Sequence, residues 1–358
     1  MKKRRLELIR AKMQKEDLQL LVVASASNRR WLSGFTGSAG MVVVSPTQAW
    51  LLVDFRYITQ AGHEADGCQL VQVDDFYKQL GVICAEQGAT RVGFESAHVT
   101  HAIWEKLQQA VASTTWVPVK NWVEEERGCK DESELASLAK AAAIADAAFT
   151  SLLPALKPGM AEKDIALELE FLMRKAGAES MAFPPIVAAG VRGAMPHATP
   201  GENKLAVGDF ITMDFGAVWQ GYCSDITRTV ALGRVDEKQR SVYNLVLAAQ
   251  QAALAAVAPG KKGCEVDAVA RDMIAAAGYD EAFGHGLGHG VGLDVHEEFP
   301  RLSRIWEGIL QPGMVCSVEP GIYLAGWGGV RIEDLVVVTA NGCRILNQAP
   351  KELLVLPV

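Results

Sequence analysis

The sequence has 358 residues, which suggests about two domains with room for a large core. Its formal net charge of −7 at pH 7 gives no reason to expect nucleic acid or an acidic membrane surface as a partner. The seven cysteines are odd in number and include no C-x-x-C pair, so the sequence predicts neither a disulfide framework nor a thiolate zinc site. We therefore expect a cytoplasmic protein.

The N-terminal part of the chain, 1–124, is predicted to be a small α/β domain. An amphipathic helix is predicted over 4–16 and a buried strand over 18–25, and strands and helices then alternate. The basic opening residues imitate a signal peptide, but charged residues interrupt the apolar segment that such a peptide needs. No apolar run approaches the roughly 20 residues that cross a bilayer, so we expect no membrane partner.

A polar connector leads into the second predicted domain, 125–358. Asp131 and Glu134 have the spacing of a capping box, which predicts a long helix through Leu153. This helix is rich in alanine and carries apolar residues at helical spacing. We interpret it as a packed helix at the domain boundary.

The second domain contains an internal repeat. The segments 158–177 and 259–278 each open with Pro-Gly and close with Ala-Gly, which predicts two helices with a Pro-Gly entry and a C-cap glycine. Downstream, GDFITMD is matched by GMVCSVE, and SDITRT by RIEDLV. These matches align four acids in pairs, Asp214 with Glu319 and Asp225 with Glu333. An approximate two-fold axis between the halves would bring all four acids into one cleft.

The segment 208–229 is predicted to form two strands joined by a tight turn at Gln220 and Gly221. The register places Trp219 opposite Tyr222, Asp214 opposite Thr227 and Asp225 opposite Gly216. Both carboxylates would then face one side, roughly 7–8 Å apart at Cβ. A single aspartate of this kind is more often a solvated strand residue. Two on one face among aromatic residues favour a shared cation, or two cations about 3.5–4 Å apart.

Four carboxylates in an apolar cleft need counter-charge, because burial and like charges raise their pKa values, and two divalent cations would supply it. We expect a fifth ligand from GHGLGHGVGLDVHE (284–297), with His289 at its centre. The glycines there favour an extended or looped backbone with a close approach to another segment over a zincin-type helix, and ordinary loop histidines are the alternative. Oxygen ligands with one imidazole suit Mn²⁺, Co²⁺ or Fe²⁺ better than a structural zinc. Metal-assisted hydrolysis of an amide is the expected reaction.

Several motifs closely resemble metallopeptidase family M24, in the branch of Xaa-Pro aminopeptidases and Xaa-Pro dipeptidases (prolidases). They are MDFGAVWQGYCSDITRT, HGLGHGVGLDVHE, SVEPGIY and VRIED, and NRRWLSGFTGSAG and VDFRY resemble the family's first domain. The resemblance covers nearly the whole chain. It implies an α/β, creatinase-like N-terminal domain and an α+β pita-bread catalytic domain with an internal pseudo-two-fold repeat and a dinuclear metal centre.

The resemblance also implies roles for individual residues. The implied metal ligands are Asp214, Asp225, His289, Glu319 and Glu333. Glu319 would also be the proton-transferring base, and His197 and His296 would hydrogen-bond the substrate and the tetrahedral intermediate. Tyr323 and Arg331 match positions that orient ligands beside the substrate. His285 matches a position near the metals, and a loop-fixing hydrogen bond is its alternative role.

Substrate choice is predicted from two features. Phe183, Pro184 and Pro185 could line an apolar pocket for a proline, whose nitrogen carries no hydrogen and whose φ is fixed. Arg301 resembles the arginine that holds the C-terminal carboxylate of a dipeptide in prolidases. One extra residue precedes Pro300 here, and a plain surface arginine is the alternative.

We therefore expect a dinuclear metal-dependent peptidase that hydrolyses Xaa-Pro bonds of short peptides, as a dipeptidase or an aminopeptidase. It would hold two divalent ions per subunit, Mn²⁺ before Co²⁺, Fe²⁺ or Zn²⁺, and the resemblance implies a homodimer. The alternatives are a non-catalytic pita-bread binding protein and a methionine-aminopeptidase-like activity. The additional N-terminal domain argues against the latter.

Overall fold

The computed structural model describes residues 2–358, which divide after Arg127 into two compact units, the second being Gly128–Val358. The boundary expected from the sequence, between residues 124 and 125, falls inside a short helix, α6 (Trp122–Gly128). We describe each unit by itself.

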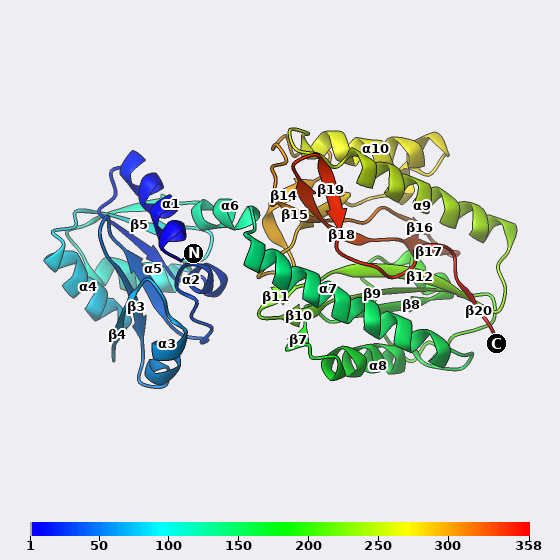
Figure 1. Cartoon of the computed structure of the whole chain (residues 1–358), viewed down its shortest axis with the longest axis horizontal. Coiled ribbons are helices and arrows are strands. Elements are labelled where there is room, and N and C mark those ends of the chain that lie inside the picture. Colours follow the sequence, from blue (N-terminus) through cyan, green and yellow to red (C-terminus); the bar gives the residue numbers. More distant parts are fainter. Residues whose placement is uncertain (1) are drawn as a thin grey trace. The chain divides into compact units, whose positions relative to one another are not determined.

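The first unit is built on a six-stranded sheet with the order β4-β3-β2-β1-β5-β6 (Figure 1). β2 is antiparallel to β1 and β3, whereas the other neighbours are parallel. Every residue of the three neighbouring strands β1, β2 and β3 is buried, which explains their continuous apolar sequences. The strands are β1 (Leu20–Val23), β2 (Met41–Val44), β3 (Ala49–Val53), β4 (Gln69–Gln72), β5 (Arg91–Glu95) and β6 (Thr115–Val119). The helices before α6 are α1 (Lys2–Lys15), α2 (Ala26–Ser33), α3 (Ile58–Glu64), α4 (Phe76–Glu86) and α5 (His101–Ala110).

The second unit combines helices with several short sheets. Its sheets have the orders β11-β10-β7, β20-β12-β9-β8, β14-β13-β15-β18-β19 and β16-β17. The helices are α7 (Glu132–Leu152), α8 (Glu162–Lys175), α9 (Glu237–Ala256) and α10 (Gly263–Ala276), with 3₁₀ turns η1 (Leu153–Ala155), η2 (Gly190–Ala194) and η3 (Asp280–Ala282). The strands are β7 (Ser180–Met181), β8 (Ile186–Ala189), β9 (Phe210–Phe215), β10 (Ala217–Trp219), β11 (Tyr222–Cys223), β12 (Ile226–Leu232), β13 (Gly288–Gly290), β14 (Glu297–Leu302), β15 (Val315–Val318), β16 (Gly321–Leu324), β17 (Gly328–Arg331), β18 (Asp334–Thr339), β19 (Gly342–Ile345) and β20 (Val355–Leu356).

The two halves of this unit follow the same plan, which confirms the predicted internal repeat. α7 and α8 lie on one side of the strands, and α9 and α10 on the other (Figure 1). Apolar residues of α7 and α8 share one core with β9 and β12, whereas those of α9 and α10 share another with β15 and β18. Both strand pairs are antiparallel.

The repeated helices begin later than their sequence pattern predicts. α8 starts at Glu162 and α10 at Gly263, each a few residues after its Pro-Gly. Gly159 and Gly260 have φ values of 87° and 85°, so each Pro-Gly forms a turn before the helix. The predicted C-cap glycines are confirmed, because Gly177 and Gly278 are also left-handed, with φ values of 105° and 85°.

The predicted hairpin register is confirmed. Gln220 and Gly221 both have positive φ, as a two-residue hairpin turn requires, and Trp219 pairs with Tyr222. Asp214 pairs with Thr227. The two predicted strands are, however, each divided near Gly216, where an added Cβ would lie 1.9 Å from the Ser224 carbonyl oxygen. The tip, β10 and β11, joins β7 in a separate sheet.

α7 is the predicted long helix, and its Asp131 and Glu134 form the expected capping box. Together with η1 it is long and apolar enough to cross a membrane by length and composition alone. This differs from the expectation that no apolar segment would be long enough. More than half of its most apolar window, 56%, is buried inside the protein. Leu138, Ala145 and Phe149 are among these buried residues, so α7 serves here as a core helix.

Candidate metal centre

A cavity of about 550 Å³ is lined by residues from both halves of the second unit. The structure brings together here all four predicted acids and all four predicted histidines, namely Asp214, Asp225, Glu319, Glu333, His197, His285, His289 and His296. The acids sit at equivalent ends of the two antiparallel strand pairs. Asp214 lies near the end of β9 and Glu319 follows β15, whereas Asp225 and Glu333 immediately precede β12 and β18.

His289 is held on β13 between two neighbouring strands, β14 and β15. An added Cβ at Gly288 would lie 2.0 Å from the Ser317 carbonyl oxygen, and one at Gly290 would lie 2.3 Å from that of Phe299. Glycines therefore flank His289 because backbones approach β13 closely on both sides. This confirms the extended, closely packed backbone predicted for the segment.

The ring orientation of His289 leaves one nitrogen facing the acids. Its Nδ1 lies 3.1 Å from the Gly290 carbonyl oxygen, which can only accept, so Nδ1 carries the hydrogen. Nε2 then presents a lone pair, 3.6 Å from Asp225 Oδ2 and 3.4 Å from Glu319 Oε1. Burial lowers the pKa of His289, which keeps the ring neutral. A lone pair facing carboxylates is a repulsive arrangement unless a proton or a metal cation lies between them.

The carboxylates also lie where a bound cation would stabilise them. Ligand atoms of Asp225, His289 and Glu333 all lie within 4.8 Å of one another. Asp214 Oδ1 and Glu333 Oε1 are buried and have no hydrogen-bond partner. A buried carboxylate oxygen without a partner costs free energy that coordination of a cation would offset. The donor set of oxygens and one imidazole nitrogen therefore fits divalent metal ions.

The pKa shifts of the carboxyl groups in this cluster also favour bound cations. Burial, reinforced by neighbouring carboxylates, raises the pKa values of Asp225 and Glu333 well above their ordinary range. Burial also raises the pKa of Glu319. Without cations the cluster therefore retains protons that free carboxyl groups would lose, and binding of cations would release them.

We expect the metal-free protein to lose stability as the pH rises. A carboxyl group whose pKa is higher in the folded state stabilises the fold at low pH, and this contribution is lost as the pH rises through the folded-state pKa. Urea unfolding should give a smaller free energy at pH 8 than at pH 5 without metal, and a weaker trend with saturating Mn²⁺. The variant Asp225→Asn is the control, because it removes one raised carboxyl and should flatten the metal-free trend. An identical trend with and without Mn²⁺ would contradict this account.

A second layer of hydrogen bonds orients the acids. Arg331 Nη2 lies 2.6 Å from Asp214 Oδ2, and its Nε donates to Thr227 Oγ1 at 3.0 Å. The Thr227 hydroxyl in turn donates to Glu333 Oε2 at 2.7 Å. Arg331 therefore acts on one acid directly and on another through Thr227. Such outer contacts fix the direction of metal ligands.

Tyr323 and His285 extend this layer. Arg331 Nη1 donates to the Tyr323 hydroxyl oxygen at 2.8 Å, which leaves that hydroxyl to donate to His285 Nε2 at 3.0 Å. His285 Nδ1 donates to the Gly286 carbonyl oxygen at 2.8 Å, in agreement with Nε2 as the acceptor. Burial raises the pKa of Tyr323 to about 12, so the hydroxyl keeps its proton. His285 thus makes the loop-fixing hydrogen bond considered above and still lines the cavity.

The remaining predicted residues lie in different places. His296 packs against His289, with ring centroids 4.2 Å apart, and Phe183, Pro184, Pro185 and Ile186 form an apolar wall of the cavity. Arg301 lies on β14, bonded to Glu298, and lines a neighbouring groove of about 680 Å³. That groove shares His285, His289 and His296 with the cavity. Tyr323 lies behind Arg331 rather than among the residues that line the cavity.

Two residues of the site, Thr227 and Ser317, were not predicted from the sequence to belong to it. Thr227 joins Arg331 to Glu333, as described above. Ser317 donates to Glu319 Oε1 at 3.0 Å and accepts from the His289 backbone N–H at 3.0 Å, so it links two of the predicted ligands. Side chains two positions apart in a strand lie on the same face. Thr227 is two positions from Asp225 and Ser317 two from Glu319, so the sequence could have predicted both residues beside the acids.

Comparisons with known proteins agree with this geometry. Residues 136–340 match the model of metallopeptidase family M24, and residues 5–129 match the creatinase/prolidase N-terminal domain. The chain is 43% identical to an uncharacterized peptidase of Bacillus subtilis, over 94% of this chain and 95% of that one. It is 36% identical to a Xaa-Pro dipeptidase of Pyrococcus horikoshii, over 96% of both chains.

Solved structures show the same likeness. A Xaa-Pro dipeptidase from Bacillus anthracis has a TM-score of 0.97 at 40% identity, covering 99% of this chain and 100% of that one. An X-Pro aminopeptidase from Thermotoga maritima has a TM-score of 0.90 at 35% identity, covering 96% of this chain and 99% of that one. The likeness therefore extends over both units, and the two structures carry different activity names.

Proposed function

Because the chain belongs to metallopeptidase family M24, we propose that it hydrolyses Xaa-Pro bonds of short peptides with two bound divalent cations. The expected fold, a creatinase-like α/β domain followed by a pita-bread catalytic domain, is confirmed by these matches. We assign the cations to five residues: Asp214, Asp225, His289, Glu319 and Glu333. Mn²⁺ is the proposed ion, with Co²⁺, Fe²⁺ and Zn²⁺ as the other candidates.

One observation carries this proposal. Buried carboxylate oxygens of Asp214 and Glu333 lack partners in the same cavity in which the lone pair of His289 faces two further acids. All five ligand-type residues are present, so the non-catalytic alternative has no support in the site. When bound, the cations would supply Lewis acidity and a water of lowered pKa at neutral pH.

The protein's own residues would move the protons. Glu319 would take the proton of the attacking water at a carboxylate oxygen. The proline nitrogen must gain a proton as the C–N bond breaks, because it leaves as a neutral amine. Glu319 would deliver that proton. Ser317 holds Glu319 in place through its hydroxyl hydrogen bond.

The cavity walls would position the substrate. His197 and His296 line the cavity and would donate hydrogen bonds to the carbonyl oxygen as it gains negative charge. The apolar wall from Phe183 to Ile186 would receive the proline ring, which needs no hydrogen-bond acceptor for its nitrogen. Arg331, Tyr323 and His285 would act from behind this surface, by fixing the acids and the loop.

The direct test is hydrolysis by the Mn²⁺-loaded protein of Ala-Pro, Ala-Ala and Met-Ala-Ser, compared at equal concentration. The proposal predicts that Ala-Pro is preferred. Preference for Met-Ala-Ser would instead support a methionine-aminopeptidase-like activity. No hydrolysis of any of the three by protein that contains the metal would contradict the peptidase assignment.

We expect Arg301 to distinguish a dipeptidase from an aminopeptidase. If Arg301 leaves Glu298 and binds the C-terminal carboxylate of a dipeptide, amidation of Ala-Pro should raise KM by about 10- to 150-fold, as expected for loss of about 1.5–3 kcal/mol in a charge-assisted contact. The variant Arg301→Ala should show the same high KM for both forms. Arg304→Ala is the matched control, because Arg304 lines the same groove. Equal KM values for the acid and the amide in the unmodified enzyme would remove this role.

The homodimer and the cytoplasmic location remain proposals. The dimer is expected from the likeness to the family, and sedimentation that shows only monomer at micromolar concentration would contradict it. The location rests on the cysteine pattern of the sequence, seven scattered cysteines without a C-x-x-C pair.

A further inference from the structure

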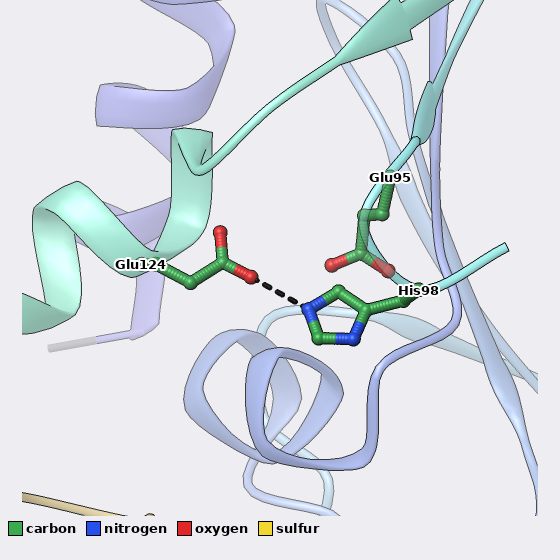
Figure 2. Close-up of side chains that lie close together, drawn as sticks. All are labelled: Glu95, His98 and Glu124. Atoms are coloured by element: carbon green, nitrogen blue, oxygen red, sulfur yellow. Dashed lines mark hydrogen bonds and ion pairs between the residues drawn. The ribbon is translucent and has the colours of Figure 1, made fainter. Parts of the chain in front are cut away.

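The first unit holds a second group of metal-ligating side chains, which the proposed peptidase chemistry does not use. Glu95 is the last residue of β5, His98 lies in the turn that follows, and Glu124 lies in the first turn of α6. One ligand atom from each lies within 4.8 Å of the other two. Figure 2 shows that the three side chains point toward one another, with His98 Nε2 2.9 Å from Glu124 Oε1.

A single asparagine holds the two carboxylates. Arg127 Nη1 donates to Asn28 Oδ1 at 2.7 Å, and a guanidinium can only donate, so the amide NH₂ of Asn28 must face the acids. That NH₂ donates to Oε1 of Glu95 at 2.6 Å and to Oε1 of Glu124 at 2.7 Å. Hydrogen bonds of this kind from outside a site orient carboxylate ligands.

The two carboxylates lie in a place that favours a cation. Glu95 is only 5% exposed, and its Oε2 accepts from the backbone N–H groups of Ala24 and Ser25 at 2.6 and 2.9 Å. Burial raises the pKa of Glu95, and the charge of Glu124 adds to this effect. A divalent cation between the two acids would cancel both charges and relieve their repulsion.

There is also space for one ion. A cavity of about 10 Å³ is lined by Glu95, His98 and Glu124, among others, which is close to the smallest volume that can hold a single water molecule. The His98 side chain is 41% exposed, so water can reach the site and complete the coordination. Two oxygens and one imidazole nitrogen with a water ligand suit Zn²⁺ and similar transition-metal ions. Mg²⁺ and Ca²⁺ prefer oxygen ligands alone.

We propose that Glu95, His98 and Glu124 bind one divalent cation of the Zn²⁺ class, separate from the cations of the peptidase centre. The ion joins the end of β5, the following turn and the start of α6. It therefore ties α6 to the sheet of the first unit. Its place far along the sequence from the five peptidase ligands allows the two sites to be tested independently.

The test compares Zn²⁺ bound per chain in the full-length protein and in variants of this cluster. Metal-free samples are dialysed against the same micromolar Zn²⁺, and bound metal is measured by mass spectrometry. The variants His98→Ala and Glu124→Gln each remove one ligand. His101→Ala is the matched control, because His101 is an exposed histidine three positions further along the chain.

The expected result is about one Zn²⁺ fewer per chain in His98→Ala and in Glu124→Gln than in the unmodified protein and His101→Ala. The variant Asp225→Asn should still lose this one ion when His98→Ala is added, whatever happens at the peptidase centre. Equal Zn²⁺ content in the unmodified protein, both ligand variants and the control would overturn the proposal. The contact of His98 with Glu124 would then be an ordinary ion pair.

Discussion

Replacing Glu319 by glutamine lowers kcat for Ala-Pro by roughly two to four orders of magnitude, the range expected for loss of a general acid-base group. Glutamine keeps the shape of the side chain and an oxygen that can still accept the 3.0 Å hydrogen bond from Ser317. It cannot take a proton from the attacking water. The loss should therefore appear mainly in kcat, with a much smaller change in KM.

The control for Glu319→Gln is Glu307→Gln, at an exposed acid that contacts Lys262. It should leave kcat unchanged. Metal content must be measured for both variants, because Glu319 is also a proposed ligand. A kcat for Glu319→Gln within tenfold of the unmodified enzyme, at equal metal content, would show that another group transfers the proton.

The variant Arg228→Met should reduce the free energy of unfolding by about 3–5 kcal/mol, the cost typical of breaking a buried ion pair. Arg228 is 1% exposed and donates to the backbone carbonyl oxygen of Glu333, one of the proposed metal ligands. Its guanidinium contacts five groups: the carbonyl oxygens of Thr227, Glu333, Ala349 and Pro350 and the carboxylate of Asp334. Burial alone would raise the pKa of Asp334. The positive charges of Arg228 and Lys351 outweigh this effect and hold that pKa below its ordinary value.

Urea unfolding of the metal-free protein measures this effect. Arg234→Met is the matched control, because Arg234 follows the same strand but is exposed, and it should change stability little. Because Arg228 also holds the backbone of Glu333, the unfolding defect should be accompanied by weaker Mn²⁺ binding. A loss below 1 kcal/mol with normal Mn²⁺ affinity would mean that the buried pair contributes neither stability nor position.

The parts of the site that local rules govern could be predicted from the sequence. A two-residue turn with a glycine sets the hairpin register, and that register places Asp214 opposite Thr227. The repeat then places Glu319 and Glu333 at the matching ends of β15 and β18, without any knowledge of distances. The glycines around His289 predict close backbone contacts, because a residue without a Cβ lets another backbone approach.

Other features depend on contacts between distant segments, which one sequence does not reveal. The division of the hairpin at Gly216 follows from its approach to Ser224 and from the pairing of β10 with β7. The hydrogen bond between Arg301 and Glu298, and the groove that Arg301 lines beside the cavity, depend on how β14 packs against its neighbours. The cluster of Glu95, His98 and Glu124 was not predicted at all, because Glu124 reaches it from another segment.

The central claim is that two cations lie among Asp214, Asp225, His289, Glu319 and Glu333. Anomalous diffraction from crystals soaked in Mn²⁺ tests it most directly. The account predicts two peaks in the cavity, about 3.5–4 Å apart, each within bonding distance of these side chains. A single peak, or none, in crystals whose cavity is open to the soaking solution would contradict it.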